Sequence, residues 1–229
     1  MITPFDWQEG IGNRAQYIEG KLKHGSPVVA VSLESGILIY TRRRQSRKIF
    51  EVYDRLMFSA IGQQSDVEAL RSAAVEFAHQ EGYNRSEQDV TIQRVVTALS
   101  TPVKKAFADF NTAPLVARSL FAEVADELRE DKYYILNYDG DYHTVSGGAV
   151  VTGSSSHHVD AENVVAEIDR SQTPEAAVAL LANIWATIVK EDEDEDELKE
   201  ELEAEAMFLE RSSAREDRFR SIPTSNAKQ

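Results

Sequence analysis

Two adjacent histidines are the first candidates for chemistry in this chain of 229 residues. His157 and His158 could begin a metal site, but a zinc site takes three or four protein ligands. No third and fourth ligand stands nearby at a usable spacing, so we interpret the pair as a solvated helix entrance and expect no metal. The chain has no cysteine, which excludes thiolate catalysis, disulfides and cysteine metal sites together. We expect no cofactor.

A short basic cluster is the second candidate. Arg42-Arg43-Arg44 and Arg47-Lys48 could form a nucleic-acid patch, because lysine and arginine bind phosphates. The net charge of the chain is −14, however, and a strong binder of nucleic acid or of an anionic membrane needs a basic face. We therefore expect neither as a partner and assign the arginines to salt bridges at protein contacts.

Most of the negative charge is local. The stretch from Glu191 to Glu205 holds eleven of the 39 acidic residues and a single lysine, so the rest of the chain is only mildly acidic. Such a run could bind a basic partner, but like-charge runs are usually solvated. We interpret residues 191–205 as an acidic insertion.

The sequence shows no sign of export or of membrane insertion. No apolar run approaches the roughly 20 residues that span a bilayer. The N-terminal residues MITPFDWQEG lack the basic start and apolar stretch of a secretory signal. We expect a cytoplasmic protein.

Hydrophobic periodicity predicts the elements that must position these groups. Helices are expected at 13–24, at 66–82 with Ser65 and Glu68 as a capping box, from about 86 with a kink or break at Pro102, at 159–170, and from Thr173 onward. Strands are expected at 28–33, 37–41, 49–53, 56–61, 115–124, 133–138, 142–151, 206–209 and 219–222. The pair Gly147-Gly148 suggests a bulge or a close backbone approach.

The order of these elements indicates the fold class. Strands and helices come in groups instead of alternating one by one, which argues against a doubly wound parallel sheet. Strands 28–33 and 37–41 are apolar on both faces, so their sheet must be covered on both sides. The sequence predicts an α+β fold of two mostly antiparallel sheets flanked by helices. We divide it into a loose arm (1–12), a main domain (13–190), the acidic insertion, final strands (206–222) and a disordered tail (223–229).

Several segments, in order, resemble the proteasome family, and in particular its bacterial α-type subunits. They are YIEGKLKHGS (17–26), SRKIFEVYDR (46–55), SAIGQ (59–63), Phe77-Ala78, Gly82-Tyr83, Asp89-Val90-Thr91 and Tyr138-Asp139-Gly140. The resemblance covers about residues 13–190 and is most specific over 17–91. It implies the four-layer αββα sandwich of the N-terminal-nucleophile hydrolase superfamily.

The resemblance also implies a site and a set of partners. Lys48 would bind the C-terminal carboxylate of an ATP-dependent ring activator, in a pocket whose other walls are Gly25, Gly62 and Gln63. Pro4, Phe5, Asp6 and Trp7 would belong to a gate at the axial pore. The partners would be proteasome β subunits, sister α subunits in a seven-membered ring, and unfolded protein substrates in transit.

No residue is expected to be catalytic. In this superfamily the nucleophile is the first residue of a processed chain and uses its own amine as the base. Ser26, after Gly25, stands at the corresponding position, but the matching strand end (Thr41 to Arg44) carries no acid and lysine pair. Two alternatives stay open: a self-processing hydrolase that uses Ser26, and a stand-alone oligomeric scaffold with the same fold.

Overall fold

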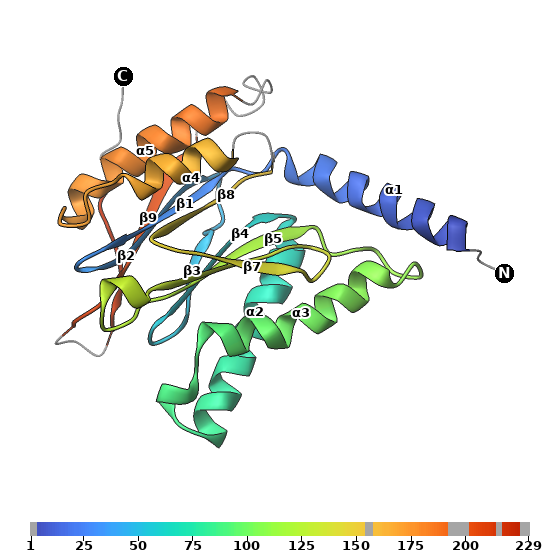
Figure 1. Cartoon of the computed structure of the whole chain (residues 1–229), viewed down its shortest axis with the longest axis horizontal. Helices are drawn as coiled ribbons and strands as arrows, with labels where there is room; N and C mark the ends of the chain where they lie inside the picture. Colours follow the sequence, from blue (N-terminus) through green and yellow to red (C-terminus); the bar gives the residue numbers. More distant parts are fainter. Residues whose placement is uncertain (1–3, 154–157, 192–201, 214–216, 225–229) are drawn as a thin grey trace.

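Two five-stranded sheets stack face to face between two layers of helices (Figure 1). The computed structural model describes residues 4–153, 158–191, 202–213 and 217–224. The first sheet has the order β10-β9-β2-β1-β8 and the second the order β3-β4-β5-β6-β7. Every strand pair is antiparallel. The predicted α+β class with a four-layer αββα sandwich is confirmed.

The helices and strands occur along the chain in the predicted order. The strands are β1 (Val28–Leu33), β2 (Gly36–Arg43), β3 (Ile49–Tyr53), β4 (Leu56–Gly62), β5 (Ala117–Glu123), β6 (Lys132–Leu136), β7 (Tyr142–Val145), β8 (Gly148–Val151), β9 (Glu203–Glu210) and β10 (Phe219–Ser221). The helices are α1 (Pro4–Leu22), α2 (Gln64–Asn84), α3 (Ile92–Ala108), α4 (His158–Ala166) and α5 (Pro174–Glu191), with short 3-10 turns at Glu87–Asp89 and Leu128–Glu130.

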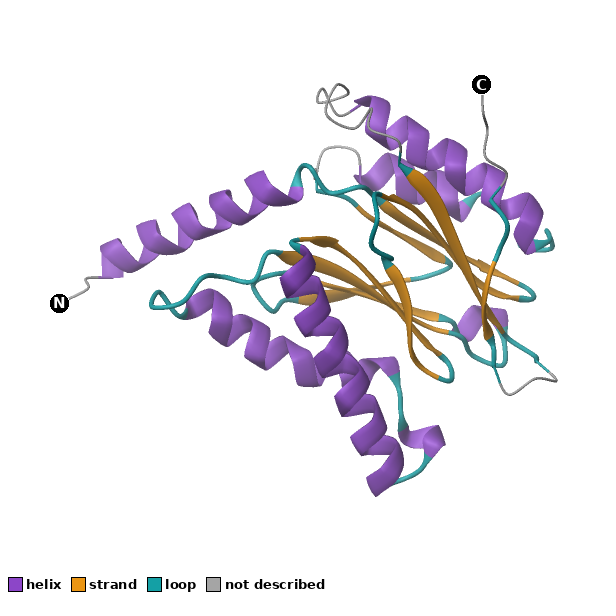
Figure 2. Ribbon diagram, turned by 180° about the vertical axis from the view of Figure 1, so that it is seen from behind, coloured by secondary structure: helices purple, strands orange, loops and turns teal. Residues whose placement is uncertain are grey.

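Strand β1 shows why the sheets need a layer on each side. All six of its residues are buried, and alternate side chains of a strand point to opposite faces. Val28 and Ala30 lie in the core between the two sheets. Val29 and Val31 lie in a second core with residues of α4 and α5. A third core joins the other sheet to α2 and α3, and Figure 2 shows these helices covering its outer face.

Helix α1 begins nine residues earlier than predicted. It starts at Pro4 and ends at Leu22, so residues 4–12 are helical and the prediction of a loose arm there is wrong. Proline suits the first position of a helix, because the N–H that it lacks has no partner there. A Cβ on Gly10 would lie 3.0 Å from the Phe110 ring, so this glycine lets the helix approach the α3–β5 loop.

The predicted strand 142–151 is two strands in different sheets. β7 pairs with β6, whereas β8 pairs with β1. The chain crosses between the sheets at Gly147, whose φ is +78°, a value that favours glycine. A Cβ on Gly148 would lie 2.3 Å from Val165 Cγ1. The predicted close approach is therefore confirmed, and it marks the crossing point.

Two local predictions in the helical layer are wrong. The residue that caps α2 is Gln63, without a side-chain hydrogen bond, while the Glu68 carboxylate pairs with Arg71. Helix α3 continues through Pro102, so of the expected kink or break, the break is wrong. Its apolar face includes Val96, Leu99 and Val103 and is buried on both sides of the proline, and this packing offsets the missing hydrogen bond.

An ion pair joins the sheets at the end opposite α1. The Arg211 guanidinium donates to Asp131 Oδ1 and Oδ2 at 2.6 and 2.8 Å, and to the backbone oxygens of Leu33, Glu34 and Ala125. The side chains of Arg211 and Asp131 are 9% and 1% exposed. All five N–H groups of the arginine are used, so this buried charge is fully compensated.

No helix in the described part of the chain is long and apolar enough to cross a membrane.

Replacing Arg211 by alanine should destabilise the domain by about 3–5 kcal/mol, because the Asp131 carboxylate would stay buried without its partner. Thermal or urea denaturation measures the change. Arg55→Ala is the matched control, since Arg55 pairs with the exposed Asp126 and exposed pairs contribute little. Equal denaturation midpoints for the two variants would contradict the assigned role of Arg211.

Candidate functional site: a basic pocket beside Lys48

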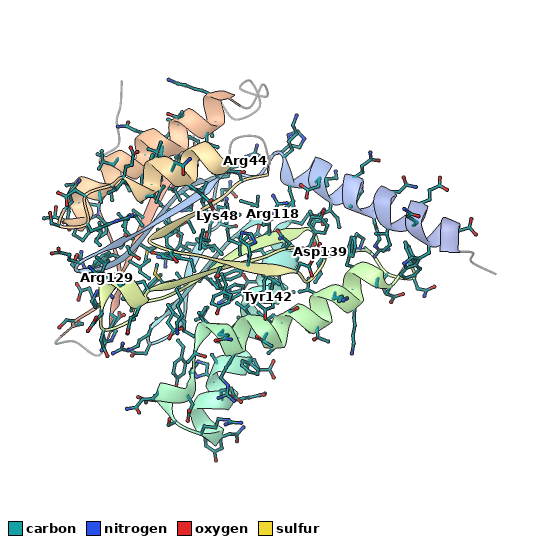
Figure 3. The ribbon with its side chains drawn as sticks, in the orientation of Figure 1. Arg44, Lys48, Arg118, Arg129, Asp139 and Tyr142 are labelled. Carbon is teal, nitrogen blue, oxygen red and sulfur yellow. The ribbon has the colours of Figure 1, made fainter. Side chains whose placement is uncertain are left out.

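A pocket of about 1120 Å³ opens where α1 leaves the sandwich. Its walls come from the α1–β1 connection, the β2–β3 loop, the start of α2 and the start of β9. The lining residues are His24, Gly25, Ser26, Arg42, Arg43, Arg44, Gln45, Ser46, Arg47, Lys48, Ala60, Gly62, Gln64, Val67, Leu202 and Glu203. Figure 3 shows Arg44 close to the point where α1 leaves the body, with Lys48 farther in.

Lys48 is held from two directions. Its ammonium Nζ donates to the carbonyl oxygen of Ser26 at 2.7 Å, and its backbone N–H donates to Glu205 Oε2 at 2.9 Å. Burial removes water from the ammonium and lowers the pKa of Lys48 to about 8, although the nearby Glu205 carboxylate acts in the opposite direction. Among the described residues, the ammonium of Lys48 has one backbone partner, and it lies partly buried in the wall of an open pocket.

Glu205 was missed by the sequence analysis because it fell inside the predicted insertion. Strand β9 begins at Glu203, and its Glu205 pairs in register with Thr41 of β2. Glu205 is 7% exposed, so the boundary of the insertion at 205 is wrong. The alternation of Glu203 and Glu205 with small residues has the period of a strand and could have revealed it. Residues 192–201 lie outside the described part of the chain.

The basic cluster is divided by its contacts. Arg43 pairs with Glu203 at 2.9 Å and approaches Glu205 at 3.6 Å. The guanidinium of Arg42 lies over the Trp185 ring, 4.8 Å from its centroid, and its Nε donates to the Tyr40 hydroxyl. The salt bridges expected at contacts between protein chains are, for Arg43, formed within the chain.

Ser26 lies beside Lys48, whose Nζ donates to the Ser26 carbonyl oxygen. The strand end from Thr41 to Arg44 carries no lysine, as the sequence analysis stated. The lysine arrives from the β2–β3 loop and not from the strand end at Thr41. The Ser26 hydroxyl accepts a bond of 3.3 Å from Trp185 Nε1. The Lys48 ammonium therefore contacts the carbonyl oxygen of Ser26. The hydroxyl of Ser26 takes part in a separate hydrogen bond with Trp185.

Of the three other residues predicted to line the pocket, two line it and one does not. Gly25 and Gly62 line the pocket, whereas Gln63 does not and Gln64 does. A Cβ on Gly62, whose φ is +134°, would lie 2.0 Å from the Val116 carbonyl oxygen. A Cβ on Gly25 would lie 2.9 Å from Ile61 Cβ. The packing of the chain itself therefore accounts for both glycines.

Arg118 anchors α1 to both sheets, a role that the sequence analysis did not anticipate. Its guanidinium donates to Glu19 Oε1 of α1 at 2.8 Å, to the Thr152 carbonyl at 2.7 Å and to Asn137 Oδ1 at 2.9 Å. Burial and the Glu19 carboxylate raise the pKa of Tyr138 to about 12. The C-terminal half of α1 is thus held by charge and by the buried Ile18 and Leu22.

The predicted gate residues lie in the first turn of α1. Trp7 is 44% exposed and packs edge-on against Phe110 with ring centroids 5.0 Å apart. Pro4 begins the helix and Asp6 lies in its first turn. The side chains of Pro4 and Phe5 lie outside the described part.

The fold agrees with the comparison to known families. The model of the proteasome family, described as "Proteasome subunit", matches residues 22–199. The chain belongs to the proteasome family. It is similar to the proteasome subunit alpha of Jonesia denitrificans, with 30% identity over 165 residues that cover 70% of this chain and 69% of that protein.

Two further relatives carry the same name. The proteasome subunit alpha of Xylanimonas cellulosilytica is 32% identical over 159 residues, covering 68% of this chain and 65% of that protein. That of Frankia casuarinae is 27% identical over 175 residues, covering 71% and 72%. The chain is therefore grouped with the α-type subunits of bacterial proteasomes, as its sequence segments indicated.

Replacing Glu19 by glutamine should loosen α1 while leaving the sandwich folded, because Arg118 loses its charged partner at the helix. Hydrogen exchange should become faster in α1 and stay unchanged in β1 and β4. Glu9→Gln, an exposed position on the same helix, is the control. Unchanged exchange in α1 would show that apolar packing alone holds the helix.

Proposed function

We propose that the chain is a non-catalytic α-ring subunit of a proteasome core particle. In this role it gates substrate entry, scaffolds the ring of β subunits and docks an ATP-dependent activator. The observation that carries the proposal is the position of Lys48, whose ammonium lies in the wall of an open basic pocket. The family membership supplies the context, and the local geometry supplies the chemistry.

Docking follows from the charge and shape of the pocket. A terminal carboxylate is a single compact anion, and lysine is a compact cation with three donors. Lys48 Nζ uses one donor on Ser26, which leaves capacity for a carboxylate in the pocket. The backbone at Gly25 and Gly62 lines the same space, so an extended peptide end could approach the main chain closely.

The non-catalytic role rests on what precedes Ser26. Its nitrogen is an amide joined to Gly25, and an amide has no basic lone pair with which to activate the hydroxyl. Helix α1 occupies the residues before it and is anchored by Arg118. A hydrolase that uses Ser26 as its first residue is the second candidate, and the contact of Lys48 with Ser26 is the observation that favours it.

Gating and assembly are assigned to α1 and to the outer helices. Tyr17 on α1 and Tyr83 at the end of α2 are 51% and 91% exposed, and large exposed aromatic side chains are enriched at protein contacts. Sister α subunits and β subunits are the proposed occupants of these surfaces, in a seven-membered ring in the cytoplasm. The turn of α1 that carries Pro4, Phe5, Asp6 and Trp7 would face the pore through which unfolded substrates pass.

Lys48→Ala should leave the assembled complex intact and abolish most of the stimulation of protein degradation by the activator. Lys132→Ala is the control, because Lys132 is an exposed lysine that lines a different pocket. Native electrophoresis measures assembly, and degradation of an unfolded substrate measures stimulation. Unchanged stimulation in Lys48→Ala would remove Lys48 from the docking site.

The binding of a carboxylate-ended activator peptide should weaken as the pH rises through 8. The lowered pKa of Lys48 means that the ammonium is mostly present at pH 7 and mostly lost at pH 9. A bound carboxylate favours the ammonium, so the affinity should fall about tenfold between these values. Fluorescence anisotropy measures it, and the Lys48→Met variant should bind weakly with no such dependence.

The mature chain should keep residues 1–25. Intact mass spectrometry of the purified complex checks this, and the same sample shows whether a threonine-type β subunit co-purifies. A mature chain that starts at Ser26 would establish the hydrolase. An intact chain without any β partner would instead favour a stand-alone scaffold.

A further inference from the structure

Helix α1 is attached to the body of the protein more firmly in its C-terminal half than in its N-terminal half. Ile18 and Leu22 of the C-terminal half are fully buried. Arg118 adds a charged hydrogen bond to Glu19 in the same half. The first turns of the helix instead extend beyond the two sheets, toward the loop that follows α3 (Figure 1). The two halves of α1 therefore have different supports.

The aromatic ring of Phe110, in that loop, contacts the N-terminal half of α1. Trp7 packs edge-on against the ring, and a Cβ on Gly10 would lie 3.0 Å from it. Ile11 adds a partly buried contact at the margin of the core between the sheets. Because Trp7 and Phe110 are 44% and 38% exposed, their contact buries little apolar surface. Such a contact opens at a lower cost in free energy than the buried core does.

Firm attachment of α1 begins at Arg14. Its Nη2 donates to the Thr112 carbonyl oxygen at 2.7 Å and to the Ala106 carbonyl oxygen at 3.2 Å. Ala106 lies in the last turn of α3, where the helix dipole favours a cation. The Arg14 guanidinium also lies over the Phe110 ring, 5.3 Å from its centroid. Arg14 therefore keeps the Phe110 ring in place whether or not the first turns of α1 are bound to it.

The residues just before Arg14 are poor helix formers. The segment Gly10-Ile11-Gly12-Asn13 holds two glycines and an asparagine, which lower the stability of a helix relative to alanine. The close approach to Phe110 explains Gly10, but packing within the chain does not explain Gly12. Among the described residues, no atom outside the local helix backbone lies within 4 Å of a Cβ built on Gly12. A weak helical segment between two attachments is where a hinge is expected.

We infer that residues 4–11 are a hinged arm that detaches from the body by bending at Gly12-Asn13, and that Phe110 is the latch that holds the arm. The inference rests on the proposed gating function and deepens it, because it assigns the movement at the pore to one half of α1. The half from Arg14 to Leu22 keeps its contacts with the body during the movement. The detached arm is too short to stay helical in water, so its hydrogen bonds open when it leaves Phe110.

Hydrogen exchange in the assembled complex tests the latch. Amides of residues 8–11 should exchange about tenfold or more faster than those of residues 15–22, because the arm opens without the anchored half. Phe110→Ala should speed exchange in the arm about two- to tenfold further and leave residues 15–22 unchanged. Tyr142→Ala is the matched control, since the Tyr142 side chain is 39% exposed against 38% for Phe110. Equal acceleration in both halves of α1 in Phe110→Ala, or none in the arm, would overturn the inference.

Two glycine variants of the same helix test the hinge. Gly12→Ala should slow exchange of residues 8–11 about fivefold, because alanine stabilises the helix at the point where it bends. Gly20→Ala is the matched control, since a Cβ there also meets open space among the described residues but lies on the anchored side of the hinge. Equal slowing of the arm by both variants, or by neither, would show simple fraying of the helix end and would overturn the hinge.

A glycine on an exposed helix face can also leave room for a neighbouring chain, and assembly separates this explanation from a hinge. Gly12→Ala should assemble as the unmodified chain does, as measured by native electrophoresis. Loss of assembly in Gly12→Ala but not in Gly20→Ala would identify Gly12 as a contact between copies. That result would overturn the hinge.

Degradation of an unfolded protein, with and without the activator, connects the arm to gating. A gate must both latch and bend, so the ratio of stimulated to unstimulated degradation should fall about threefold or more in Phe110→Ala and in Gly12→Ala. The ratio should stay unchanged in Tyr142→Ala and Gly20→Ala. Unchanged ratios in all four variants, with altered exchange in the first two, would overturn the role of the arm in gating. An unmodified complex that the activator does not stimulate would overturn the gating function itself, while the exchange rates still decide the hinge.

Discussion

The short segment between α1 and β1 is restrained from both sides, and the geometry of the site depends on this restraint. Arg118 holds Glu19 at the last turns of the helix, and the Lys48 ammonium holds the carbonyl of Ser26. Because both cations reach the segment from the body of the fold, the direction of α1 and the shape of the pocket are set together. The two sheets therefore fix the position of the main chain between α1 and β1.

The electrostatics of the pocket follow from a balance between burial and pairing. Removing water from Lys48 disfavours its charge, and the carboxylate of Glu205 restores only part of the loss. Arg43 is in turn balanced by Glu203 and Glu205. Strand β9, which carries these acids, therefore contributes to the pocket as much as the basic β2–β3 loop does. Together with burial, its Glu205 sets the pKa of Lys48 at about 8.

The sequence predicted what depends on periodicity and missed what depends on distant pairing. The two-sided burial of β1 and the helical stripe of α3 follow from local patterns. The contact of Lys48 with Glu205 joins residues 157 positions apart, and no local pattern encodes it. The start of α1 was missed although Pro4 suits the first position of a helix. The pair Gly147-Gly148 marked a close approach, but the switch of sheets depends on the pairing of β8 with the distant β1, which no local pattern encodes.

The central place of β2 beside β9 has a consequence for synthesis on the ribosome. Ile37 of β2 pairs with Leu209 of β9, about 170 residues later. At roughly 5–20 residues per second, one apolar edge of β2 waits on the order of ten to thirty seconds for its neighbour. During that interval the nascent polypeptide presents an open strand of the kind that nucleates aggregation. During its synthesis, this member of a protein-degradation family is therefore itself at risk of misfolding.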